Sequence, residues 1–125
     1  MIVSGSSRWL PVTAIERVRS LDGLPCIHER IVLPTALFPD LAERDDLPNN
    51  LYELYSAAYG IKVARATEQV KAVAADRRQA EVLGVREGEP LLAVDRVAFG
   101  LDGARAEWRL SLCRTDRFHY LCELR

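Results

Sequence analysis

The hydrophobic pattern predicts six β-strands, because apolar and polar residues alternate in short segments that are rich in β-branched side chains. These segments cover residues 12–20, 25–33, 61–74, 90–100, 104–114 and 118–124. The alanine content of the third segment would also suit a helix, and we favour the strand. A Leu-Asp-Gly sequence separates the first two segments, and another separates the fourth from the fifth. Both sequences predict β-hairpins.

Two other segments have the spacing of amphipathic helices. Apolar residues recur at intervals of three and four between Asn50, which suits an N-cap, and Gly60, which suits a helix end. A second short helix is predicted over residues 77–83, after Asp76, and a helical turn around residues 36–41. The order of elements therefore predicts an α+β fold, with a mostly antiparallel sheet and the helices packed on one face.

Composition and charge exclude several classes of function. The chain has 125 residues, about one domain, and a net charge of −1. A DNA-binding surface needs an excess of Lys and Arg, so this chain is not expected to bind DNA by itself. No apolar run is long enough to span a membrane and no signal peptide is visible, so we expect a cytoplasmic protein.

Metal and cofactor chemistry is not indicated. The three cysteines have no C-x-x-C spacing, and the two histidines lie on separate segments without acidic residues at ligand spacing. We therefore expect reduced, buried thiols and neither a metal site nor a cofactor.

The first hairpin brings charged residues together. A three-residue loop predicts that Arg17 faces Ile27 and that Ile15 faces Glu29. Arg17, Arg19 and Glu29 would then project from one side of the sheet. A two-residue loop would move Glu29 to the other side, but the position of the glycine favours the longer loop.

The second hairpin gives a similar result. Its loop predicts that Val97 faces Glu107 and that Asp95 faces Arg109. Glu107 and Arg109 would share one face of the sheet. Arg96 would be the exception on the opposite face, which is otherwise apolar and is the better candidate for the core.

Glu29 is unusual because its strand face is otherwise made of large apolar residues. A carboxylate in such surroundings is costly to bury without a partner. One interpretation is an ordinary cross-strand ion pair with Arg17 or Arg19 on a solvated face. The other is a ligand site, since arginine forks bind phosphate or carboxylate oxygens and a glutamate accepts from hydroxyls or amines.

Short motifs over residues 15–124 resemble a known family when they are taken in order. They are Arg17-Val18-Arg19, Asp22-Gly23-Leu24-Pro25, Glu29, Leu51-Tyr52, Tyr59-Gly60, Gly88-Glu89-Pro90-Leu91-Leu92, Asp102-Gly103, Glu107 and Arg114-Thr115-Asp116-Arg117-Phe118. Together they resemble the UTRA domain, the effector-binding part of GntR/HutC-family bacterial transcription regulators.

This resemblance implies a chorismate-lyase-like fold over residues 8–125 and a non-enzymatic sensor of a small anionic metabolite, such as a phosphorylated sugar, an amino acid or a carboxylate. It also implies a homodimer that contacts operator DNA through an N-terminal winged helix-turn-helix domain, which is not part of this chain.

The resemblance further implies roles for particular residues. Arg17 and Arg19 would clamp the anion, and Glu29 and Glu107 would contact hydroxyl or amine groups. Asn50 stands where the family often has a serine, so its amide would either donate to the anion or only cap the helix. Two other functions stay open: a chorismate lyase-like enzyme on the same fold, and a dimerisation module without a ligand.

Overall fold

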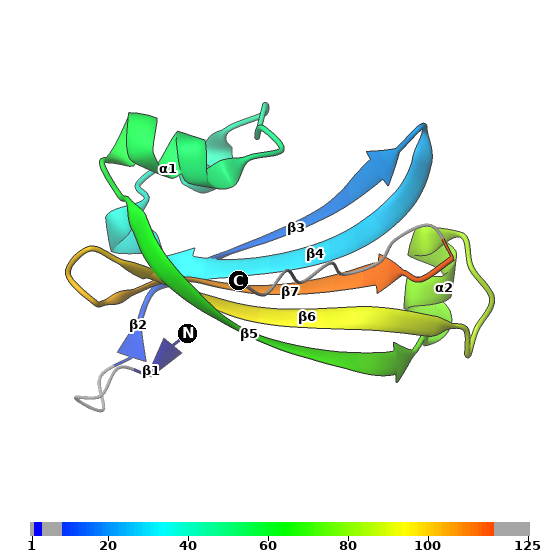
Figure 1. Cartoon of the computed structure of the whole chain (residues 1–125). Helices are drawn as coiled ribbons and strands as arrows, with labels where there is room; N and C mark the ends of the chain where they lie inside the picture. Colours follow the sequence, from blue (N-terminus) through cyan, green and yellow to red (C-terminus); the bar gives the residue numbers. More distant parts are fainter. Residues whose placement is uncertain (1, 4–8, 117–125) are drawn as a thin grey trace, which may run out of the picture.

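A five-stranded antiparallel sheet dominates the computed structural model, which describes residues 2–3 and 9–116 (Figure 1). The strands of this sheet are β3 (Val12–Leu21), β4 (Leu24–Pro34), β5 (Val63–Ala74), β6 (Pro90–Gly100) and β7 (Arg105–Arg114). Their order across the sheet is β3-β4-β7-β6-β5. A two-stranded pair, β1 (Ile2–Val3) and β2 (Trp9–Leu10), precedes it. The α+β class is confirmed, and the expected strand at 118–124 lies outside the described residues.

The helices begin where their caps predict. In α1 (Leu51–Tyr59), the Asn50 side chain accepts a hydrogen bond from the Glu53 backbone N–H, which confirms the N-cap. Asp76 caps α2 (Arg77–Leu83) within a capping box. The expected helical turn is two short 3₁₀ helices, η1 (Thr35–Leu37) and η2 (Leu41–Glu43). None of the helices in the described part of the chain is long and apolar enough to cross a membrane.

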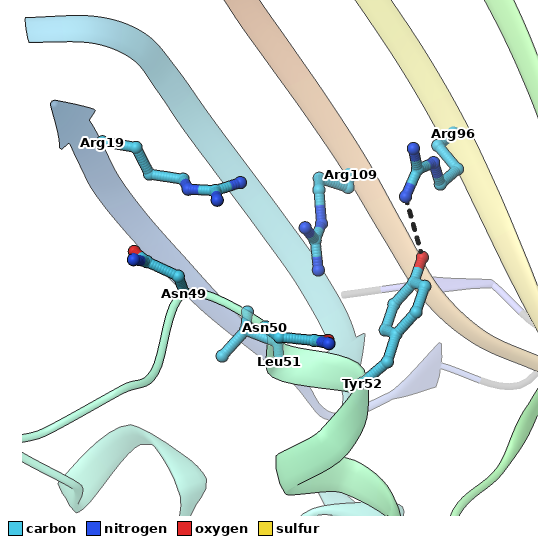
Figure 2. A pocket seen from close by; sticks show the side chains of 7 residues that line it. All are labelled: Arg19, Asn49, Asn50, Leu51, Tyr52, Arg96 and Arg109. Atoms are coloured by element: carbon cyan, nitrogen blue, oxygen red, sulfur yellow. Dashed lines mark hydrogen bonds between the residues drawn. The ribbon is translucent and has the colours of Figure 1, made fainter. Parts of the chain in front are cut away.

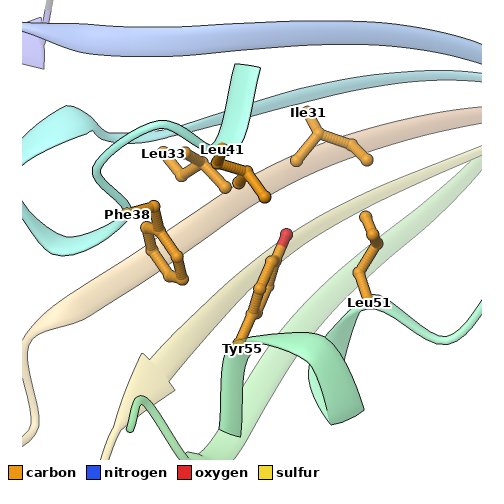
Figure 3. Packing of buried hydrophobic residues seen from close by; sticks show 6 residues of the cluster. All are labelled: Ile31, Leu33, Phe38, Leu41, Leu51 and Tyr55. Carbon is orange, nitrogen blue, oxygen red and sulfur yellow. The ribbon is translucent and has the colours of Figure 1, made fainter. Parts of the chain in front are cut away.

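Each helix covers its own face of the sheet. Between α1 and the sheet, buried side chains from β4, the η1–η2 segment and the helix form one cluster: Ile31, Leu33, Phe38, Leu41, Leu51 and Tyr55 (Figure 3). Leu83 of α2 packs in a second cluster with Leu91 and Leu112. Leu112 is paired with His28, so its side chain lies on the opposite face from that of Ile31. This arrangement differs from the expectation that both helices pack on one face.

The predicted register of the first hairpin is wrong, although the predicted shared face is confirmed. The loop has two residues, since Leu21 pairs with Leu24. A bulge beside Arg19 then inserts one extra residue in β4, so that Arg17 faces Glu29 rather than Ile27. The short loop and the bulge each move the pairing by one residue. Their effects on side-chain direction cancel, and Glu29 stays on the face of both arginines.

The second hairpin also departs from its predicted register, but only through a bulge. The three-residue loop is confirmed by the hydrogen bond from the Gly100 N–H to the Ala104 carbonyl. The register shifts by one residue beyond Ala98, so Ala98 faces Glu107 and Arg96 faces Arg109. The prediction that Asp95 faces Arg109 is therefore wrong. Arg96 lies on the same face as Arg109, which is the face that α1 covers.

Candidate functional site

A polar cavity of about 260 Å³ lies between the sheet and the start of α1. Its lining residues are Arg19, Asn49, Asn50, Leu51, Tyr52, Arg96 and Arg109 (Figure 2). Arg19 comes from β3, Arg109 from β7 and Arg96 from β6, so the guanidinium groups follow the order of the strands. Among the described residues, the lining includes three arginines and no carboxylate. The cavity is slightly smaller than most ligand pockets and suits a metabolite.

Glu29 lies behind this lining and is only 2% exposed. Its Oε2 atom accepts from Arg17 Nε at 2.7 Å, and its Oε1 atom lies 3.4 Å from Arg19 Nη1. Arg109 Nη1 is 3.9 Å from the same Oε1 atom. Three guanidinium groups therefore surround one buried carboxylate. This arrangement answers the question of how Glu29 is buried among apolar residues: it is paired.

Arg17 does not line the cavity. Its Nη1 and Nη2 atoms donate to the backbone carbonyls of Pro48 and Asn49, at 2.9 and 3.1 Å. Each nitrogen atom of the guanidinium group thus already donates to a protein acceptor. In this structure Arg17 anchors the loop before α1 to the sheet, and Arg19 is the member of the R-x-R pair that reaches the cavity.

Glu107 is also buried behind the lining. It accepts from Arg109 Nε and Nη2 at 3.0 and 2.8 Å, and from the Tyr55 hydroxyl at 2.5 Å. Burial on its own would lower the pKa of Arg109, but the hydrogen bonds and negative charge of Glu107, and the charge of Glu29, raise it above the ordinary value. Glu107 therefore holds a charged Arg109 in place at the wall of the cavity.

Arg96 is held in a similar way. Its Nε and Nη2 atoms each lie 2.6 Å from Glu68 Oε2, and its Nη1 atom donates to the Tyr52 hydroxyl at 3.3 Å. Burial lowers the pKa of Arg96, but the hydrogen bonds to Tyr52 and Glu68 raise it above its ordinary value. A charged guanidinium group therefore forms the end of the cavity farthest from Arg19 (Figure 2).

Asn50 contributes both to the helix and to the cavity. Its Oδ1 atom caps the Glu53 N–H, while the residue also lines the cavity at the N-terminus of α1. The partial positive charge of a helix N-terminus favours a bound anion. The two sequence interpretations of Asn50, a cap and a cavity residue, are therefore compatible.

The structure brings Arg19 and Asn50 to the cavity, and it places Arg17, Glu29 and Glu107 immediately behind the wall. Sequence reasoning did not assign Tyr52, Arg96 or Arg109 to the site. Arg109 could have been found, because it was placed on the face of Glu107. Arg96 was hidden by the bulge in the second hairpin, and its one signal was a charge on a strand face predicted to be apolar.

The sequence profile of the UTRA domain matches residues 7–119. The chain is 33% identical over 119 residues to the transcriptional repressor PhnF from Mycolicibacterium smegmatis, covering 94% of this chain and 48% of PhnF. The crystal structure of the PhnF effector domain superposes with a TM-score of 0.85 at 30% identity, covering 92% of this chain and 70% of that structure.

A second solved structure is the ligand-binding domain of a GntR-family regulator from Bordetella bronchiseptica. It matches with a TM-score of 0.82 and 34% identity, covering 91% of this chain and 74% of that structure. The chain spans about half the length of the curated relatives it matches. Those relatives are transcription regulators and not enzymes, which confirms the expected non-enzymatic class.

Proposed function

This chain belongs to the UTRA family of effector-binding domains from GntR-type transcription regulators, and we propose that its cavity binds a small anionic metabolite. The observation that carries the proposal is the cavity lining. Three guanidinium groups and the N-terminus of α1 converge on a space of metabolite size, and Glu29 and Glu107 are buried behind the wall. Such a lining favours phosphate or carboxylate oxygens over neutral ligands.

The residue roles in this proposal follow the geometry. Arg19 and the start of α1, with Asn50, hold an anionic group directly. Arg17, Glu29 and Glu107 keep the loop and Arg109 in position through their hydrogen bonds. A hydroxyl or amine of the ligand reaches either carboxylate only after an arginine moves, because both glutamates are buried.

For the whole protein we propose a cytoplasmic homodimer. Residues 8–125 form its effector domain, and a preceding winged helix-turn-helix domain contacts operator DNA. The ligand controls DNA binding by favouring one arrangement of the dimer, which requires unequal affinity for the two arrangements. The polar cavity supports an effector-binding domain over a dimerisation module without a ligand. A dimerisation module does not require three arginines at the wall of a cavity.

The test of anion binding is isothermal titration calorimetry of this chain with inorganic phosphate, glucose 6-phosphate, glycerol 3-phosphate and succinate. We expect at least one of these probes to bind, and Arg19→Gln to weaken it by about tenfold or more. Hydrogen bonds to charged groups are worth about 1.5–3 kcal/mol, and each 1.4 kcal/mol corresponds to about a factor of ten in affinity.

The matched control is Arg77→Gln, which removes the same charge from an exposed position of α2, on the other face of the sheet. This variant should bind each probe as the wild type does. Equal loss in both variants would indicate a general effect of net charge. Binding that is unchanged in Arg19→Gln would show that the anion lies elsewhere.

A further inference from the structure

Arg96 and Arg109 are direct partners across neighbouring antiparallel strands. Like charges in directly opposed positions destabilise a sheet. Both side chains nevertheless point to the same face and line the same cavity (Figure 2). Two cations held together at a cavity wall are the arrangement that a bound anion would stabilise.

The two guanidinium groups are held in matching ways. In Arg109 the Nε and Nη2 atoms are occupied by Glu107, and in Arg96 the same two atoms face Glu68. The third nitrogen differs. Arg109 Nη1 has no hydrogen-bond partner among the described residues and lies 3.9 Å from Glu29. Among the described residues, the only hydrogen-bond partner of Arg96 Nη1 is the Tyr52 hydroxyl, at 3.3 Å.

Glu107 and Glu68 therefore hold Arg109 and Arg96 in place, and the Nη1 atom of each arginine can donate to a ligand in the cavity. Two Nη1 groups from adjacent strands, with the Tyr52 hydroxyl beside them, can donate to the oxygens of one carboxylate or phosphate group. Arg19 is not part of this pair. It lies on β3, two strand spacings from β7, or about 10 Å between backbones.

We propose that Arg96, Arg109 and Tyr52 form a second anion subsite, so that the effector carries two anionic groups. One group binds at Arg19 and the start of α1, and the other binds at the Arg96–Arg109 pair. The chemical class is a short dicarboxylate or a phosphorylated carboxylic acid. This inference rests on the proposed function, since it divides the same cavity between the two ends of one ligand.

The test compares probes that differ in one anionic group. 3-Phosphoglycerate and glycerol 3-phosphate share a phosphate and a three-carbon skeleton, and a carboxylate of the first replaces a hydroxymethyl group of the second. Succinate and butyrate form a second pair. We expect the wild-type chain to bind the member with two anionic groups at least about tenfold more tightly in one of these pairs.

Arg96→Gln should remove this preference, because it should weaken binding of the probe with two anionic groups by about tenfold or more relative to the probe with one. Arg96→Lys keeps the charge, so it preserves the balance with Glu68, but it lacks the fork and should lose most of the preference. Arg65→Gln is the control on the opposite face of the same sheet, where Arg65 stacks on Phe99. It should keep the wild-type preference.

Two results would overturn the second subsite: no preference for either probe with two anionic groups, or a preference that both Arg96 variants retain. In either case, binding of glycerol 3-phosphate that depends on Arg19 would leave the proposed function intact. Failure of every anionic probe to bind the wild-type chain would instead reject the proposed function, and the second subsite with it.

Discussion

The Tyr55 hydroxyl donates a 2.5 Å hydrogen bond to Glu107, which joins α1 to β7 in the interior of the domain. Burial and the negative charge of Glu107 raise the pKa of Tyr55 well above its ordinary value. The phenol therefore stays protonated at neutral pH and can donate this hydrogen bond. Because Glu107 also holds Arg109, the position of the helix is coupled to the wall of the cavity.

Replacing Tyr55 by phenylalanine measures how much the hydrogen bond between α1 and β7 contributes to stability. We expect the Tyr55→Phe variant to lose about 1–3 kcal/mol of unfolding free energy, since a buried acceptor loses one of its donors. Urea denaturation gives the value. Tyr59→Phe is the control, because the Tyr59 hydroxyl meets an exposed Arg44 at 3.1 Å and should cost less than about 0.5 kcal/mol. Equal costs for the two variants would contradict the proposed link.

Glu16 makes part of the stability dependent on pH. It contacts His28 Nε2 at 2.6 Å and the Arg78 side chain of α2. The hydrogen bonds from His28 and then Arg78 lower the pKa of Glu16 below its ordinary value of 4.5. A carboxyl group whose pKa is lower in the folded state stabilises that state above its unfolded pKa, and this contribution is lost as the pH falls through the folded pKa.

The comparison of Glu16→Gln with the wild type should therefore depend on pH in a defined direction. The wild type should be the more stable protein at neutral pH, and the difference should shrink from pH 4.5 downward. Urea midpoints of both proteins at neutral pH and at about pH 3 check this expectation. A difference that is the same at both pH values would show that the Glu16 charge does not contribute.

The first hairpin loop needs a residue that accepts positive φ. Asp22 and Gly23 have φ values of 51° and 79°, which are typical of a type I′ turn. Gly23→Ala should cost more than about 1 kcal/mol of unfolding free energy, although the added methyl group would meet no atom within 4 Å. Asp22→Asn is the control and should be nearly neutral, since asparagine tolerates the left-handed conformation. Thermal unfolding of both variants checks the difference.

Cys113 should be unreactive in the folded domain. Its side chain is 1% exposed, and burial, with the nearby charge of Glu29, raises the pKa of the thiol to about 11. In a Cys122→Ser background, a thiol reagent at pH about 8 should label the protein slowly until urea unfolds it. Fast labelling of Cys113 under native conditions, identified by mass spectrometry of the peptides, would contradict the predicted burial.

The fold was predictable because its signals are local. Alternation identified the strands of the described sheet, Asn50 and Asp76 identified the starts of both helices, and the ambiguous segment 61–74 is a strand. The register was not predictable, because a bulge is a single extra residue with no consistent sequence signature. Cys26 and Ala106 are the extra residues implied by the two register shifts, and both are small and buried.

The site was predictable only in part for the same reason. The shared face of Arg19 and Glu29 was predicted correctly because the shorter loop and the bulge have opposite effects on side-chain direction. The charge pattern around these residues indicated an anion. The separation of Arg17 from the cavity depends on where the Pro48–Asn49 loop passes, which is a tertiary contact. The inclusion of Arg96 depends on a register that the sequence did not specify.

The bulge between β6 and β7 also determines which charge faces the cavity. Without the extra residue, Asp95 would lie opposite Arg109, and an acid would replace the base that now occupies this place. Loss of one residue near Ala106 would thus place an acid–base pair, Asp95 and Arg109, where the two arginines now lie opposite each other. Domains built on this sheet can therefore change ligand class through the deletion of a single codon, which leaves the codons of Arg96 and Arg109 in the gene.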